Sequence, residues 1–184
     1  MNTSFRRITN EEVGAAHSAY ISVYEWLNAK GVRQWLRALS QETFAERQRD
    51  GQLFALYVDD RVAAVVTLAF EASTYWLEAI GGEGRWWVKS LAVVRAWRGA
   101  GIGKRVMLEC EAVVRDAGAS EVLIDCVDGG FLPPYYAGLG YEALAHREIT
   151  YPSGNTFPMV LMRKELNDAY KSLQATAAAP SSSD

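Results

Sequence analysis

A glycine-rich segment with basic side chains is the part of this sequence best suited to bind a ligand. It reads RAWRGAGIGK from Arg95 to Lys104, between a strand-like apolar run and a helix-like pattern. The first backbone amides of a helix have no acceptor within the helix, and with the positive end of the helix dipole they attract anions. Glycines allow a ligand to approach the backbone closely, and Arg98 and Lys104 add positive charge. The segment therefore predicts a phosphate-binding loop.

Three phosphate-loop patterns can be compared with this segment. A P-loop requires glycine and Ser or Thr where this chain has Arg98 and Arg105. The dinucleotide-binding pattern Gly-x-Gly-x-x-Gly requires glycine where Lys104 stands. The remaining pattern is Arg-x-x-Gly-x-Gly, formed by Arg98, Gly101 and Gly103. A glycine-rich turn without a ligand is the alternative.

The remaining pattern resembles the pyrophosphate-binding motif of the GNAT superfamily of acyltransferases, which carry it between a central strand and a helix. The resemblance extends from about residue 5 to residue 166. It includes a tyrosine followed four and five residues later by a glycine and an aromatic residue, here Tyr136, Gly140 and Tyr141. The last strand-like run, from Met159 to Leu166, is also similar to the usual ending of the family.

The resemblance implies an N-acetyltransferase that uses acetyl-CoA as acyl donor and a primary amine as acceptor, by direct transfer and without a metal. It places the pantetheine arm beside the backbone of Leu91, Ala92 and Val93, in a gap between two splayed strands. It places the pyrophosphate on the backbone of the loop, at Arg98, Gly99, Ala100, Gly101, Ile102, Gly103 and Lys104.

Two departures from the family pattern follow the next predicted strand. Many relatives have an asparagine where this chain reads Asp128-Gly129-Gly130, and Pro133-Pro134 replace ordinary helix formers. Since proline is tolerated at a helix start and not within a helix, we expect this helix to begin late. The departures keep open an alternative function, a catalytically degenerate acyl-CoA-binding sensor or interaction module.

Acyl transfer from a thioester to an amine requires a proton donor for the departing thiolate and a neutral amine. The resemblance makes Tyr136 the general acid. Asp125 is a tentative base or polar contact, because its strand should border the cleft, although strand alternation could point it elsewhere. Glu71, Glu78 and Glu83 lie in the connection that often shapes the acceptor pocket in the family. The simpler interpretation is that each is a solvated carboxylate on the surface. The base is left open.

Aromatic and sulfur-containing side chains have alternative roles. Trp35 and Trp76 lie in segments that could form an aromatic wall for a cation, but packing in the core is the preferred interpretation. Cys110 and Cys126 lie in apolar patterns and are predicted to be small core residues rather than nucleophiles.

The surrounding patterns predict the elements that position these residues. A capping-box spacing from Thr9 to Glu12 starts a helix that ends near Gly31. A strand, helix and strand between residues 86 and 127 form a crossover unit, so its two strands should be parallel neighbours. The expected strands cover 5–8, 53–58, 62–70, 86–94, 121–127, 143–149 and 157–166, and further helices cover 40–50, 102–117 and 135–139. The predicted fold is a single mixed α/β domain, with helices flanking a mostly antiparallel sheet that contains one parallel, splayed strand pair.

Length and composition agree with one globular domain. We expect a GNAT-like domain over residues 1–166 and a flexible extension over 167–184, which is rich in Ala, Pro and Ser. The net charge of −3 argues against a nucleic-acid partner. No apolar run is long enough for a transmembrane helix and the start lacks a signal core, so no membrane partner is expected. With two cysteines, a reducing cytoplasm is the expected location. Dimers are frequent in the family, so a homodimer is a further expectation.

Overall fold

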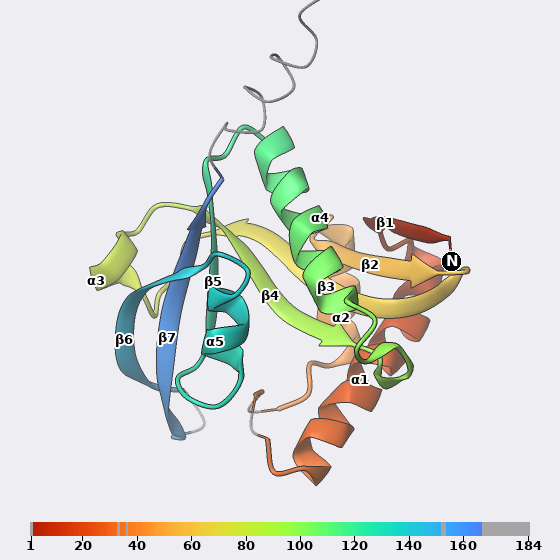
Figure 1. Ribbon diagram of the computed structural model, residues 1–184, viewed down its shortest axis with the longest axis horizontal. Coiled ribbons are helices and arrows are strands. Elements are labelled where there is room, and N and C mark those ends of the chain that lie inside the picture. Colours follow the sequence, from red (N-terminus) through yellow and green to blue (C-terminus); the bar gives the residue numbers. More distant parts are fainter. Residues whose placement is uncertain (1, 33, 36, 152–153, 167–184) are drawn as a thin grey trace, which may run out of the picture.

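The computed structural model describes residues 2–32, 34–35, 37–151 and 154–166. They form a seven-stranded sheet in the order β1-β2-β3-β4-β5-β7-β6, shown in Figure 1. The strands are β1 (Thr3–Arg7), β2 (Leu53–Val58), β3 (Arg61–Glu71), β4 (Arg85–Val93), β5 (Glu121–Val127), β6 (Glu142–Thr150) and β7 (Thr156–Glu165). All neighbouring pairs are antiparallel except β4 and β5, which are parallel. The predicted mixed sheet is therefore confirmed. The predicted extension, residues 167–184, lies outside the described residues.

Helices cover both faces of the sheet (Figure 1). They are α1 (Val13–Ala29), α2 (Gln41–Arg49), α3 (Leu77–Ile80), α4 (Ile102–Asp116) and α5 (Leu132–Ala137), with single 3-10 turns η1 (Asn10–Glu12) and η2 (Arg95–Trp97). α1 and α2 pack on one face of the sheet, and α4 packs on the other. Within the described part of the chain, no helix has both the length and the hydrophobicity needed to span a membrane.

The sequence of β2 is an unbroken apolar run, and the packing of the strand explains why. Leu53, Ala55 and Tyr57 belong to the core under α1 and α2, whereas Phe54 and Leu56 belong to the core under α4. Successive side chains of a strand point to opposite faces, and here both faces are covered. Every residue of β2 is buried as a result, so the apolar run marks a central strand.

The junction of β4 and β5 divides the sheet into two halves. One register pair, Trp87 with Leu123, joins the two strands. β5 pairs instead with β7 along its whole length, from Glu121 to Val127. The half formed by β1 to β4 and the half formed by β5, β7 and β6 therefore diverge beyond this pair (Figure 1).

Two predicted elements, the first strand and α5, have boundaries that were wrong by more than one residue. α5 begins at Leu132 and not late, with Pro133 and Pro134 inside its first turn. Proline fits there because the first amides of a helix have no acceptor within it, so no hydrogen bond is lost. The first strand is Thr3–Arg7 rather than 5–8, because Ile8 turns into the core toward α1, where it is 3% exposed.

Candidate active site

The loop between β4 and α4 takes a conformation that its glycines make accessible. Gly99 and Gly101 have φ values of 79° and 74°, in the left-handed region where a side chain is unfavourable. The first backbone bond of α4 runs from the amide of Arg105 to the carbonyl of Gly101, over 3.0 Å. The amides of the three residues between them therefore have no acceptor within the helix. Arg98 and Lys104 are exposed beside these amides.

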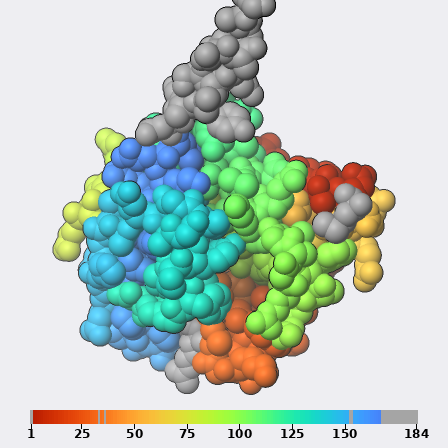
Figure 2. Space-filling view, viewed as in Figure 1, coloured from red at the N-terminus to blue at the C-terminus, as the bar shows by residue number. Residues whose placement is uncertain are grey.

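At Gly103 a neighbouring side chain, rather than the backbone conformation, disfavours a larger residue. A Cβ atom at this position would lie 2.6 Å from the hydroxyl oxygen of Tyr135, on α5. α5 and the start of α4 therefore pack closely across the opening between β4 and β5. In Figure 2 the teal atoms of the α5 region and the green atoms of the loop lie on two sides of a hollow.

β4 carries a bulge beside this opening. Ser90 and Leu91 together stand opposite one β3 residue, Val66, where the register shifts. Ser90 has a φ of 53°, and a left-handed conformation costs a residue other than glycine about 1–3 kcal/mol. A bulge of this kind re-aims the strand and interrupts its pairing.

A side chain from α2 contacts the bulge. Nη1 of Arg47 donates hydrogen bonds to Oγ1 of Thr67, at 2.8 Å, and to Oγ of Ser90, at 3.2 Å. Burial lowers the pKa of Arg47, an effect that the nearby charge of Glu71 opposes. The guanidinium stays charged at any physiological pH, so a cation lies directly behind the bulge.

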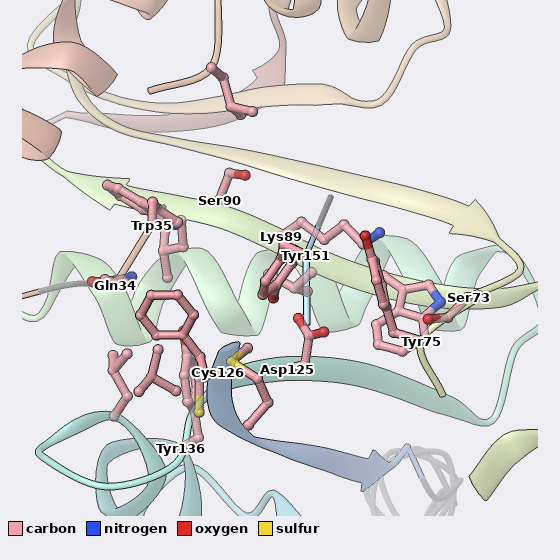
Figure 3. A pocket seen from close by; sticks show the side chains of 18 of the residues that line it. Gln34, Trp35, Ser73, Tyr75, Lys89, Ser90, Asp125, Cys126, Tyr136 and Tyr151 are labelled. Atoms are coloured by element: carbon pink, nitrogen blue, oxygen red, sulfur yellow. The ribbon is translucent and has the colours of Figure 1, made fainter. Parts of the chain in front are cut away.

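A cavity of about 340 Å³ occupies the place where β4 and β5 separate. Its walls come from residues 87–91 of β4 and 125–127 of β5, from α5, and from the segment before α2 (Figure 3). Ser90 and Leu91 line it from one side, and Asp125 and Tyr136 line it from the other. The structure thus brings the bulge, the tentative base and the predicted acid to one cavity.

Asp125 is held by a buried tryptophan. Nε1 of Trp76 donates a hydrogen bond of 3.0 Å to Oδ2 of Asp125, and Trp76 is fully buried. One carboxylate oxygen is thereby oriented from behind, while the residue itself borders the cavity. Burial, with a further contribution from Asp125, raises the pKa of neighbouring Tyr151 to about 12.

Tyr136 is 7% exposed and lies beside Cys126 in the cavity wall (Figure 3). Burial raises the pKa of its phenol well above the ordinary value, so the hydroxyl is protonated near neutral pH and can donate a proton. Burial and the charges of Asp125 and Asp128 raise the pKa of the Cys126 thiol to about 12. A protonated thiol is a poor nucleophile.

The other predicted positions divide between the two sides of β4. Leu91 and Val93 pack toward the core under α4, and Leu91 also lines the cavity. Ala92 is buried on the opposite face, under α1. Ile102, the first residue of α4, is buried in the core, so only its backbone faces the loop.

The alternative carboxylates lie elsewhere. Glu71 forms an ion pair with Lys89. The side chain of Glu78 is 89% exposed and lies 3.9 Å from Arg147, and Glu83 is exposed. Among the described residues that line the cavity, Asp125 is the sole carboxylate.

Several cavity residues were missed from the sequence. Lys89, Tyr75 and Tyr151 line the cavity without having been predicted as site residues. The one available signal was Lys89, a cation inside an apolar strand pattern. The two tryptophans considered together have different roles, since Trp35 lines the cavity and Trp76 is a buried support for Asp125.

Comparison with known proteins decides the family. The model of the acetyltransferase (GNAT) family matches residues 20–131, a range that includes β4, the loop and β5. The chain belongs to the GNAT family. Members of this family are acyltransferases, which agrees with the enzyme class predicted from the sequence.

Other GNAT proteins resemble the chain over most of its length. The uncharacterized N-acetyltransferase YesJ of Bacillus subtilis is 28% identical over 140 residues, covering 72% of this chain and 77% of YesJ. A GNAT acetyltransferase structure from Listeria monocytogenes superimposes with a TM-score of 0.71 at 16% identity, covering 89% of this chain and 94% of that one. The structure of yncA from Salmonella typhimurium, which contains its cofactor acetyl-CoA, superimposes with a TM-score of 0.69 at 13% identity over 100% of both chains.

Proposed function

We propose that this protein transfers the acetyl group of acetyl-CoA to the primary amine of a small acceptor. The observation that carries the proposal is the cavity between the splayed strands, where Tyr136 and Asp125 meet the bulge of β4. The phosphate-binding loop follows the same strand. A ligand that extends along β4 would therefore place one end on the loop and the other in the cavity.

The residues present fit acetyl-CoA. The amides of residues 102–104 have no acceptor within α4 and are suited to the pyrophosphate. Arg98 and Lys104 would add charge, and the glycines of the loop keep side chains away from the backbone. Leu91 to Val93 would offer strand-like backbone groups to the pantetheine arm. Acetyl-CoA supplies the activated acyl group as a thioester.

The two cavity side chains suit the two proton transfers of the reaction. The amine nitrogen forms a bond to the thioester carbon, and the carbon–sulfur bond breaks. The Tyr136 hydroxyl, which is protonated near neutral pH, would donate a proton to the departing thiolate. Asp125 would bind the acceptor ammonium, which loses one proton to solvent to become the neutral amine, and would receive the second proton, which the nitrogen loses after its attack. Solvent then carries that second proton to Tyr136, so one proton is released in each turnover and no covalent enzyme intermediate forms.

The cavity lining favours a small monoamine with a flat or apolar body. Trp35, Tyr75 and Tyr151 supply aromatic faces, which attract an ammonium group and stack on planar groups. A polyamine would need several carboxylates, whereas Asp125 is the sole one among the described lining residues. A volume of about 340 Å³ suits a small molecule. The same features disfavour acceptors within a folded protein.

Two measurements test the proposal in sequence. The first is the melting temperature with acetyl-CoA, with CoA and ATP as controls, because a ligand of the folded state stabilises by about 2.7 kcal/mol at a hundredfold excess over its Kd. The second is CoA release with phenethylamine, spermidine and a peptide with a free N-terminus. We expect stabilisation by acetyl-CoA and the fastest release with phenethylamine. Binding without turnover on any amine would contradict the enzyme and support the sensor alternative.

A further inference from the structure

Arg47 is a partly buried cation that the reaction described above does not use. It lies on α2, outside the cavity lining, and it donates hydrogen bonds to two hydroxyl groups, those of Thr67 and Ser90. Thr67 is 2% exposed. Across the described ranges, no carboxylate lies within ion-pair distance of Arg47. Burying an arginine without an ion pair is unfavourable, so packing alone does not explain this residue.

The contact with Ser90 connects Arg47 to the cavity. Ser90 is the bulge residue with a φ of 53°, and it lines the cavity on the β4 side. An unfavourable backbone conformation persists when surrounding contacts hold it in place. The hydrogen bond from Arg47 is such a contact, and it joins two residues that are 43 positions apart in the sequence.

The bulge determines where the backbone of β4 points. With Ser90 and Leu91 opposite one residue of β3, the local ladder is interrupted. Backbone amides freed in this way can face a ligand in the cavity, and a fixed amide near a carbonyl oxygen stabilises the negative charge that develops there. Such catalysis depends on how firmly the donor is held.

We propose that Arg47 is a positioning residue for acetyl transfer, which holds the Ser90–Leu91 bulge so that the β4 backbone meets the thioester carbonyl. This inference rests on the proposed function. The cofactor loop lies beyond the bulge and does not contact Arg47. Loss of Arg47 therefore lowers the rate of the chemical step more than it lowers the affinity for acetyl-CoA.

The test compares Arg47→Met and Arg47→Lys with Arg49→Met, a control on the exposed part of the same helix. In Arg47→Met we expect kcat to fall about ten- to a hundredfold, the effect of a misplaced reacting group. The KM for acetyl-CoA and the melting shift that acetyl-CoA produces should change little. Arg47→Lys, which keeps a donor, should recover part of the rate, and Arg49→Met should match the wild type.

A double-mutant cycle separates positioning from general structural support. Ser90→Gly keeps the left-handed conformation available without the hydrogen bond, so Arg47→Met should cost less kcat in that background than in the wild type. Ser90→Ala gives a second way to remove the bond if Arg47→Met does not fold, and should lower kcat in the same direction.

The outcomes are distinct. Three results would overturn the assignment of Arg47 alone. They are an unchanged kcat in Arg47→Met, a loss of kcat from Arg47→Met that is equal in the wild-type and Ser90→Gly backgrounds, or a loss confined to acetyl-CoA binding. A wild-type protein without turnover on any amine would overturn the proposed function and this inference together. A rate loss that Arg47→Lys partly restores and that Ser90→Gly reduces would establish it.

Discussion

The glycine-rich loop after β4 and the cavity between β4 and β5 lie at two places along β4, and they are built in different ways. The loop is one continuous segment, residues 95–104, whose useful groups are backbone amides and whose glycines permit its shape. The cavity is assembled from side chains of segments as distant as Trp35 and Tyr151. Sites made of local backbone can be recognised in a sequence, whereas sites made of distant side chains depend on the fold.

Because the two regions are separate, changes at the cavity should lower kcat and changes at the loop should weaken the binding of acetyl-CoA. The largest effect is expected for Tyr136→Phe, which removes the proton donor but keeps the ring in the wall. We expect kcat to fall about a hundredfold, a typical contribution of general acid catalysis, with the KM for acetyl-CoA nearly unchanged. Steady-state kinetics measure both constants.

Tyr24→Phe, on α1 and outside the cavity lining, is the control for Tyr136→Phe and should leave kcat unchanged. Full activity in Tyr136→Phe would remove the acid assignment. A rise in the KM for acetyl-CoA instead would show that the phenol belongs to the cofactor site, and the division between the two regions would be wrong.

A smaller effect is expected at the loop from Gly103→Ala. The added methyl group would lie 2.6 Å from the Tyr135 hydroxyl oxygen, so the Tyr135 side chain or the helix start must shift. We expect the KM for acetyl-CoA to rise about tenfold, equivalent to about 1.4 kcal/mol of binding free energy, with little change in kcat. Titration of the melting temperature with acetyl-CoA gives an independent affinity.

Adding Tyr135→Phe to Gly103→Ala provides the matched control. The conflict is with the hydroxyl oxygen of Tyr135, so removing that atom should restore much of the affinity. If the double variant binds acetyl-CoA no better than Gly103→Ala, the methyl group acts in another way, for example by blocking the ligand directly.

Trp76→Phe should have a more modest effect within the cavity. It keeps an aromatic ring in the core but removes the donor to Asp125, so the carboxylate loses its orientation. We expect kcat/KM for the amine to fall about fivefold, equivalent to about 1 kcal/mol for one hydrogen bond. Asp125→Asn in the Trp76→Phe background tests the coupling. Additive losses would mean that Trp76 does not act through Asp125.

The smallest effect is expected in the pH dependence of stability. Burial, aided by Asp125, raises the pKa of Tyr151 to about 12, whereas a tyrosine in the unfolded chain titrates near 10. Between these values the unfolded state loses its proton first, so stability is constant below about pH 10 and falls as the pH rises toward 12. Melting temperatures from pH 8 to 11 measure this. Tyr151→Phe should weaken the decline, and an unchanged decline would assign it to other groups.

The difference between the two regions also explains which parts could be predicted from the sequence. The ends of β2 and β5 were predicted correctly because strands covered on both faces give unbroken apolar runs. The position of the loop between β4 and α4 was predicted because its glycines are close together in the sequence. The predicted start of α5 was wrong because a proline pair can stand either just before a helix or in its first turn. The sequence does not separate these two cases.

The supports of the cavity could not be predicted. Trp76 and Asp125 are 49 residues apart and meet only because Trp76, just before α3, packs in one core cluster with residues of β4, β5 and β7. Arg47 and Ser90 meet through a register shift in β3 and β4 that no residue pattern announces. Asp125 was proposed from its strand, but whether it faced the cavity depended on the exact register of β5.

The single register pair between β4 and β5 has a consequence for amide protection. The strands of a sheet normally unfold together because a continuous hydrogen-bonded ladder joins them. Here one register pair joins the half formed by β1 to β4 to the half formed by β5, β7 and β6, in addition to α4 and the packed side chains. A ligand lying along β4 would act as a substitute strand. Acetyl-CoA should therefore slow hydrogen exchange in both halves of the sheet, far from the atoms that it touches, and make the two halves unfold as one unit.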